Sequence, residues 1–171
     1  MRKKDSEDYR PKLFGMKSEL FETKKAELIN LHYLVEALEF HSHCFRVAID
    51  KSEYMTLLLN SSPSNPSPDR SDLPTMEEVL QQIIANPDFL LTRHPTGGLS
   101  GSKVRYYVDI FRQDITALGE CYLRDKEPDM PGVGSFYIAD GMHRLVAYGL
   151  HTELKPEYFP IEVFFCTNTQ L

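Results

Sequence analysis

The sequence predicts one α/β domain of the α+β kind, in which flanking helices cover a small mixed sheet. Segments with apolar residues at helical spacing occur between segments in which apolar and polar residues alternate. The chain has 171 residues, an ordinary size for one domain, and 42% of them are hydrophobic, enough for a core. The longest break in the pattern, residues 60–74, follows a stretch that is short for an independent domain. We therefore expect an N-terminal tail over 1–20 and a single domain over 21–171.

The tail is polar and is broken by Pro11 and Gly15. Its basic cluster, residues 2–4, is followed by acidic residues, so we expect a solvated and mobile segment. The whole chain has a formal net charge of −6, and such a surface repels phosphate backbones on average. Composition therefore argues against broad electrostatic binding of DNA, although it leaves room for a local basic patch.

The first third of the domain predicts a helix, a strand and a loop. Thr23 is a suitable N-cap, and the apolar residues after it predict a helix over 24–39. Residues 44–50 alternate as a strand with one buried face does, and 51–59 is ambiguous but suits a short helix. Residues 60–74 hold four prolines and five serines, which predicts a long exposed loop. The apolar positions are Leu28, Leu31, Val35 and Leu38 in the helix and Phe45, Val47 and Ile49 in the strand.

A capping box opens the next helix. Thr75 and Glu78 have the required spacing, and Asn86-Pro87 ends the segment. Its apolar face consists of Met76, Val79, Leu80 and Ile83.

The middle of the chain predicts short elements. Residues 88–92 suit a short strand, and 93–103 suit a flexible loop. Residues 104–111 are rich in β-branched and aromatic side chains, which favours a strand. The segment from Asp114 fits a helix or a strand, and 127–134 reads as a turn.

The C-terminal part has the clearest pattern. A strand at 135–139 meets a helix at 141–150, with Gly149 near its expected C-cap, and a strand at 158–165 follows. Strand, turn, helix and strand make a βαβ-like unit.

The turn between that strand and helix, Asp140 to Arg144, carries the candidate chemistry. The first N–H groups of a helix have no partner within it, and the helix dipole adds positive charge, so a helix start favours anions. Gly141 permits a tight turn, Arg144 can contact phosphate oxygens, and His143 can donate a hydrogen bond or move a proton. Asp140 can orient the histidine, hold a metal ion or act as a base. In the alternative interpretation, Asp140 is a helix cap, Arg144 pairs with a surface acid, and His143 is a partly buried histidine with its bonds satisfied.

The stretch "FYIADGMHRLVAYGL", followed by "FPIEVFF", resembles the signature region of the ParB/sulfiredoxin-like superfamily, mainly over residues 135–165. ParB proteins have Gly-Glu-Arg-Arg at this turn, and sulfiredoxins have Gly-Cys-His-Arg. A related group named for an Asp-Gly-Gln-His-Arg motif differs from this chain only in having Gln in place of Met142. The helix "TMEEVLQQIIAN" also resembles the helix that precedes the motif in ParB-like chains.

The resemblance implies a turn that binds nucleotide or nucleic-acid phosphate through Gly141, Met142, His143 and Arg144. If the protein is an enzyme, Asp140 and His143 are the expected catalytic residues, in phosphoryl transfer or phosphodiester hydrolysis with Mg²⁺ and a nucleotide. Met142 replaces the reactive cysteine of sulfiredoxin, and no helix-turn-helix domain follows the motif, so neither of those activities is expected. The alternative is a non-catalytic interaction or regulatory module of a DNA-linked system, in which the turn is structural.

Two further segments suggest ligands. On a strand, His41 and His43 would share one face, and Cys44 or His32 could approach them, but the sequence shows no clear third metal ligand, so we predict no metal site. The stretch "TGGLSGSK", residues 96–103, does not have the spacing of a phosphate-binding Walker loop. It could fold over a ligand as a lid, with Lys103 or Arg105 supplying positive charge.

The three cysteines are widely spaced and form no Cys-x-x-Cys pair, which argues against a disulfide framework. The sequence shows no signal peptide and no segment long enough to span a membrane. We therefore expect a cytoplasmic protein with no membrane association. DNA-associated partner proteins and a homodimer are both open.

Overall fold

The computed structural model describes residues 1–13, 31–93, 98–125 and 136–169. Its centre is a five-stranded mixed sheet in the order β1-β2-β5-β3-β4. Adjacent strands run antiparallel except β3 and β5, which run parallel. The strands are β1 (Arg2–Lys3), β2 (His43–Ile49), β3 (Tyr122–Asp125), β4 (Phe136–Asp140) and β5 (Ile161–Thr167). The predicted fold class, a single α+β domain with a small mixed sheet and flanking helices, is confirmed.

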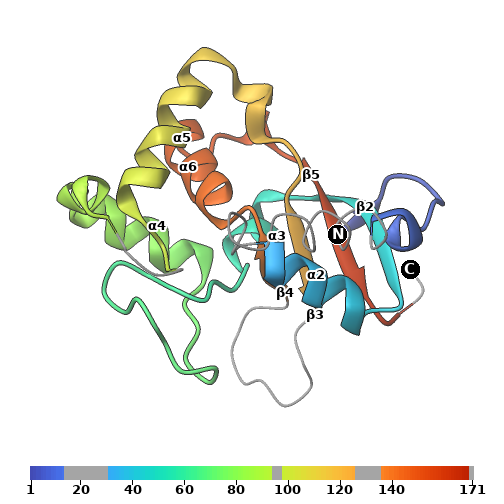
Figure 1. Cartoon of the computed structure of the whole chain (residues 1–171). Coiled ribbons are helices and arrows are strands. Elements are labelled where there is room, and N and C mark those ends of the chain that lie inside the picture. Colours follow the sequence, from blue (N-terminus) through green and yellow to red (C-terminus); the bar gives the residue numbers. More distant parts are fainter. Residues whose placement is uncertain (14–30, 94–97, 126–135, 170–171) are drawn as a thin grey trace.

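Helices lie on both faces of the sheet. Figure 1 shows α4, α5 and α6 gathered together, apart from α2. The main core joins α4, α5 and α6 to one face of the sheet, and a smaller cluster joins α2 to Cys44, Tyr122 and Cys166 on the other. The helices are α2 (Leu31–Phe40), α3 (Lys51–Met55), α4 (Met76–Ala85), α5 (Gly101–Gln113) and α6 (Met142–Thr152), with 3₁₀ helices η1 (Pro87–Leu91), η2 (Ile115–Leu118) and η3 (Pro156–Tyr158).

Several predicted elements are confirmed. Both halves of the Thr75/Glu78 capping box are present at the start of α4, and the four predicted apolar residues of that helix are buried. The predicted apolar residues of β2 face the main core, and so do Ile161, Val163 and Phe165, the alternating apolar residues of the predicted strand at 158–165. Val47 and Val163 are cross-strand partners. The predicted helix over 24–39 is present where the structure describes it, from residue 31 on. The predicted turn at 127–134 lies outside the described residues.

The predicted strand at 104–111 is wrong, because these residues belong to α5. Val104 and Phe111 are seven residues apart, the spacing that places two side chains on one face of a helix, and both are buried in the main core. Packing against α6 therefore overrides the strand preference of the β-branched and aromatic residues. The strand predicted at 88–92 is also wrong, because Pro87 opens the 3₁₀ helix η1 there. The ambiguous segment from Asp114 forms both kinds of structure, first η2 and then β3.

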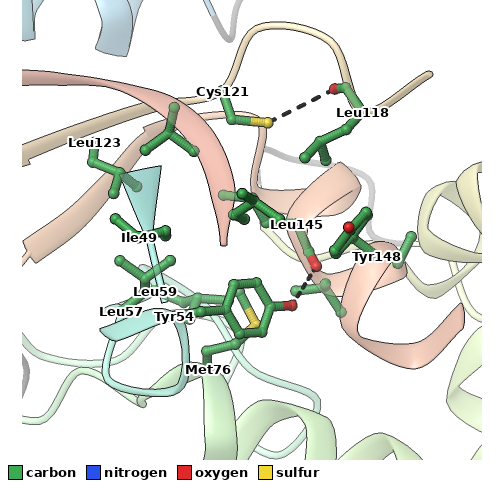
Figure 2. Packing of buried hydrophobic residues seen from close by; sticks show 14 of the residues in the cluster. Ile49, Tyr54, Leu57, Leu59, Met76, Leu118, Cys121, Leu123, Leu145 and Tyr148 are labelled. Atoms are coloured by element: carbon green, nitrogen blue, oxygen red, sulfur yellow. Dashed lines mark hydrogen bonds between the residues drawn. The ribbon is translucent and has the colours of Figure 1, made fainter. Parts of the chain in front are cut away.

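Gly149 is not near the C-cap, because α6 continues to Thr152 and its C-cap is Glu153. A Cβ atom at Gly149 would lie 2.4 Å from Tyr54 Oη, which donates a hydrogen bond to Leu145 O at 2.6 Å. Figure 2 shows the Tyr54 ring reaching across the core to that carbonyl. The glycine therefore allows Tyr54 to pass close to α6.

The C-terminal unit is not a βαβ unit. In such a unit the helix connects two parallel strands. Here β3 lies between β4 and β5, and it pairs antiparallel with β4 and parallel with β5. The strands at the two ends of α6 are therefore neither adjacent nor parallel. The sequence pattern predicted β4 and β5 as strands and left the segment of β3 open, and it carries no information on the order of the strands in the sheet.

The mobile tail predicted at 1–20 is wrong over the part that the structure describes, residues 1–13. β1 pairs with β2, Tyr9 N donates to Cys44 O at 2.7 Å, and the Leu13 side chain is buried. The charged residues that suggested solvation instead pair across strands, as Lys4 Nζ does with a Glu162 carboxylate oxygen at 2.9 Å. The segment supplies hydrogen bonds to the edge of β2, which would otherwise lack a neighbour on that side.

Residues 60–74 contain no helix or strand, as predicted, and most of them are exposed. Ser61 and Ser62 are buried, and Pro63, Pro68, Leu73 and Pro74 are half-buried. Ser61 Oγ accepts a hydrogen bond from Leu99 N at 2.9 Å. The start of the loop is thus fixed against the segment that leads into α5.

Candidate functional site

The turn between β4 and α6 depends on a glycine. Gly141 has φ +92°, a left-handed conformation that side-chain-bearing residues rarely adopt. A Cβ atom at this position would lie 2.6 Å from the Sγ of Cys121. Asp140 Oδ1 accepts a hydrogen bond from Gly141 N at 2.7 Å. Backbone conformation and close packing both require glycine here, and they set the direction in which α6 begins.

The start of α6 carries no side-chain cap. Gly141 is its N-cap and has no side chain to accept from the first N–H groups, while its carbonyl accepts from Leu145 N at 2.9 Å. Partial positive charge therefore gathers at Met142 and His143, where the helix opens.

A pocket of about 320 Å³ lies at this helix start. It brings together all five residues of the predicted turn, from Asp140 to Arg144. The rest of its wall comes from the start of the 60–74 loop, from α5, from η2 and from β4 itself: Asn60, Tyr107, Ala117, Ile138 and Ala139. The volume lies at the lower end of the range for small-molecule sites. The motif therefore forms part of a concave site of ligand size.

Arg144 lines the pocket and also holds the connection between η2 and β3. Its Nη1 donates to Leu118 O at 3.0 Å and its Nη2 to Glu120 O at 2.7 Å. Gly119, between those two residues, has φ +62°, and a Cβ atom on it would lie 2.9 Å from Nη1. The Asp140 carboxylate lies 3.8 Å from Nη2. The predicted alternative of a surface ion pair is thus only part of the role of Arg144, which binds backbone carbonyls as well.

His143 is held by the backbone that leads into α5. Ser100 N donates to His143 Nε2 at 3.0 Å. Burial, together with the positive charge of Lys103, lowers the pKa of His143 to about 4. The imidazole is therefore neutral near pH 7, with Nε2 as acceptor and the proton on Nδ1. In this arrangement His143 connects α6 to the segment before α5.

The sequence did not single out Asn60 or Tyr107. Asn60 begins the long loop, and Tyr107 lies within a segment predicted as a strand. As a strand, 104–111 would give no indication of which aromatic residue faces the turn. As a helix that packs on α6, it places Tyr107 at the pocket.

The lid prediction for Lys103 and Arg105 loses its basis. Both residues lie in α5, where they are exposed, and neither lines the pocket. The segment predicted as a loop over 93–103 becomes helical at Gly101, so its last residues are part of a regular element. Lys103 still affects the site indirectly, because its positive charge lowers the pKa of His143.

His41 and His43, considered above as metal ligands, each have a different hydrogen-bond partner. His41 is buried and its Nδ1 lies 2.7 Å from Ala37 O, so it is not a surface residue. His43 Nδ1 lies 2.7 Å from the Asp8 carboxylate. Within the described residues, no group of three or more His, Cys, Asp or Glu side chains could hold a metal ion.

No protein-family model matches the chain, and no curated protein or solved structure matches it either. The relationship to the ParB/sulfiredoxin-like superfamily therefore stays a prediction that rests on the motif. In the part of the chain that the structure describes, no helix is both long enough and apolar enough to cross a bilayer.

Proposed function

We propose that the pocket at the start of α6 binds a phosphate group of a nucleotide or nucleic acid. One observation supports this most. The helix α6 has eleven residues and no side-chain cap, and its start lies in a pocket of ligand size that the Arg144 guanidinium also lines. Helix N-termini and arginine are both favourable partners for phosphate oxygens.

Arg144 can hold the chain and still contact a ligand. A guanidinium has five N–H donors, and its hydrogen bonds to Leu118 and Glu120 use two of them. The side chain is 21% exposed, so part of it is accessible from the pocket. We assign phosphate contact to Arg144 and to the N–H groups that follow Gly141.

The geometry favours binding over catalysis. His143 Nε2 already accepts from Ser100 N, and an imidazole with a pKa of about 4 is a weak base near pH 7. We therefore assign His143 a positioning role in place of the predicted proton transfer. Asp140 keeps the predicted role of a base or Mg²⁺ ligand if the protein is an enzyme. A cytoplasmic location and DNA-associated partners belong to the same proposal, which the three free thiols and the motif support.

A matched pair of variants tests the proposal. Met142 is half-buried, lines the pocket and is the first residue of α6. Met142→Glu places a negative charge at the proposed phosphate site, while Met142→Gln has nearly the same shape without the charge. We expect wild type and Met142→Gln to bind ATP, CTP, their monophosphates or a short single-stranded DNA in a calorimetric titration. Met142→Glu should lose at least about tenfold in affinity for the same ligand.

The helix dipole separates this result from misfolding. An acid in the first turn favours a helix by about 0.3–1 kcal/mol, so Met142→Glu should be at least as stable as Met142→Gln in urea. Equal affinity of the two variants, or no binding of any phosphate compound to wild type, would show that the pocket is not a phosphate site.

A further inference from the structure

The charges around the pocket nearly cancel. Among its lining residues, all of them in the described part of the chain, Arg144 is the only one with a cationic side chain. Asp140, with its carboxylate 3.8 Å from Arg144 Nη2, is the only one with an anionic side chain. His143 is neutral near pH 7 because burial lowers its pKa to about 4. What remains is the partial positive charge of the helix start, equivalent to roughly half an elementary charge. Lys103 is exposed and does not line the pocket, so its positive charge reaches the site only through its effect on His143.

A single phosphate suits this balance better than several do. A phosphomonoester carries about −1.5 to −2 charge near pH 7, and every additional phosphate adds at least one more negative charge. A di- or triphosphate would therefore bring further negative charges next to the Asp140 carboxylate. Among the described residues that line the pocket, Arg144 is the only cation that could balance them. The net charge of −6 on the chain adds to that repulsion.

The remaining wall suits an uncharged, partly apolar group. Tyr107, Ala117 and Ile138 line the pocket beside the turn, and Asn60 adds an amide with both donors and an acceptor. An aromatic ring that faces a nucleobase contributes by stacking, and an amide can recognise hydrogen-bonding groups on a base. The volume of about 320 Å³ falls within the range of small-molecule sites.

We infer that the pocket selects nucleoside monophosphates over nucleoside di- and triphosphates. The single phosphate lies at Arg144 and the start of α6, and the base lies toward Tyr107. This inference rests on the proposed phosphate site and adds the class of ligand.

Calorimetric titration of the full chain with one nucleotide series tests it. The probes are AMP, ADP and ATP, then CMP, CDP and CTP, with adenosine and cytidine as compounds without phosphate, all in EDTA so that no Mg²⁺ neutralises the phosphates. For the base that binds best, we expect the monophosphate to bind about tenfold or more tightly than the triphosphate and more tightly than the nucleoside. A triphosphate that binds as tightly as the monophosphate would overturn the inference and leave the phosphate site standing. Failure of every phosphate compound to bind would overturn both.

Asp140→Asn isolates the charge effect. The amide oxygen can still accept from Gly141 N, so the turn is kept while the negative charge is removed. We expect the preference for monophosphate over triphosphate to fall by about tenfold, the size of effect that a charge at close range has on another ionic group. An unchanged preference would show that the carboxylate does not set the selectivity and would overturn the inference.

Discussion

The starts of α4 and α6 face the same physical problem and solve it differently. At α4, Thr75 Oγ1 accepts from Glu78 N and a Glu78 carboxylate oxygen accepts from Thr75 N, so the helix start is closed by its own side chains. At α6, Gly141 offers no side chain, and the first residues of the helix line a pocket. A side-chain cap occupies the N–H groups that could otherwise bind an anion. An uncapped helix start beside a pocket is therefore a reason to look for an anionic ligand.

The largest effect on stability that we expect comes from replacing the glycine at the start of α6. Gly141→Ala adds a side chain in a left-handed conformation and places a Cβ atom 2.6 Å from Cys121 Sγ. Conformational strain of about 1–2 kcal/mol and overpacking of about 1–3 kcal/mol should together lower the free energy of unfolding by about 2–5 kcal/mol. Urea denaturation measures the loss.

Cys121→Ala provides the matched background for that variant. In this background the Sγ atom is gone, while the Cβ and Cα atoms of residue 121 stay 3.1 and 3.3 Å from the added Cβ atom. Gly141→Ala should therefore cost less than in wild type, about 1–3 kcal/mol, because the conformational strain and a smaller part of the overpacking are left. A full-sized loss in both backgrounds would mean that packing against Cys121 does not restrict position 141.

The second effect concerns pH, since the α6 start contains a titrating group. The pKa of His143 is about 4 in the folded protein, below its ordinary value of 6.5. Between these values the unfolded chain binds more protons than the folded one, so stability rises with pH. The contribution is fully present above about pH 6.5 and is lost as the pH falls toward 4, and its size is about 3 kcal/mol.

Urea midpoints at pH 7, 5.5 and 4 check this expectation. His143→Gln cannot titrate, and its amide can still accept from Ser100 N. Its stability should therefore fall less over this range than that of wild type. Parallel pH profiles for the two proteins would assign the pH dependence to other groups.

The smallest effect on the free energy of unfolding should come from removing the side-chain cap of α4. Thr75→Ala removes the cap and should cost about 1 kcal/mol, whereas Thr75→Ser keeps the hydroxyl and should cost much less. Denaturant midpoints of the two variants measure the difference. Because Thr75 does not line the pocket at the start of α6, neither change should alter nucleotide affinity. A loss of nucleotide affinity in Thr75→Ala would contradict the idea that only the start of α6 takes part in binding.

The same contrast explains what the sequence could predict. Capping of α4 is local, since Thr75 and Glu78 are three residues apart, and periodicity revealed the buried faces of α4, β2 and β5. The α5 helix is not a local property, because its strand-forming residues become helical through packing against α6. Docking of the N-terminal segment likewise depends on the free edge of β2.

For the site, the motif predicted the five residues from Asp140 to Arg144, and the structure gathers them at one pocket. Their partners could not be predicted. Arg144 binds the carbonyl oxygens of Leu118 and Glu120, and His143 binds the amide of Ser100. Every residue has a backbone carbonyl and nearly every residue a backbone amide, so sequence carries no sign of which one a side chain will meet.

The order of strands in the sheet also bears on how the chain is made. β5 is the central strand, and it is synthesised after the other four. Cys44 of β2 faces Cys166 of β5, 122 positions along the chain. Until β5 leaves the ribosome, β2 and β3 each lack the neighbour that joins the two halves of the sheet. High contact order of this kind slows folding and leaves strand edges exposed during synthesis, when a nascent chain is most exposed to aggregation.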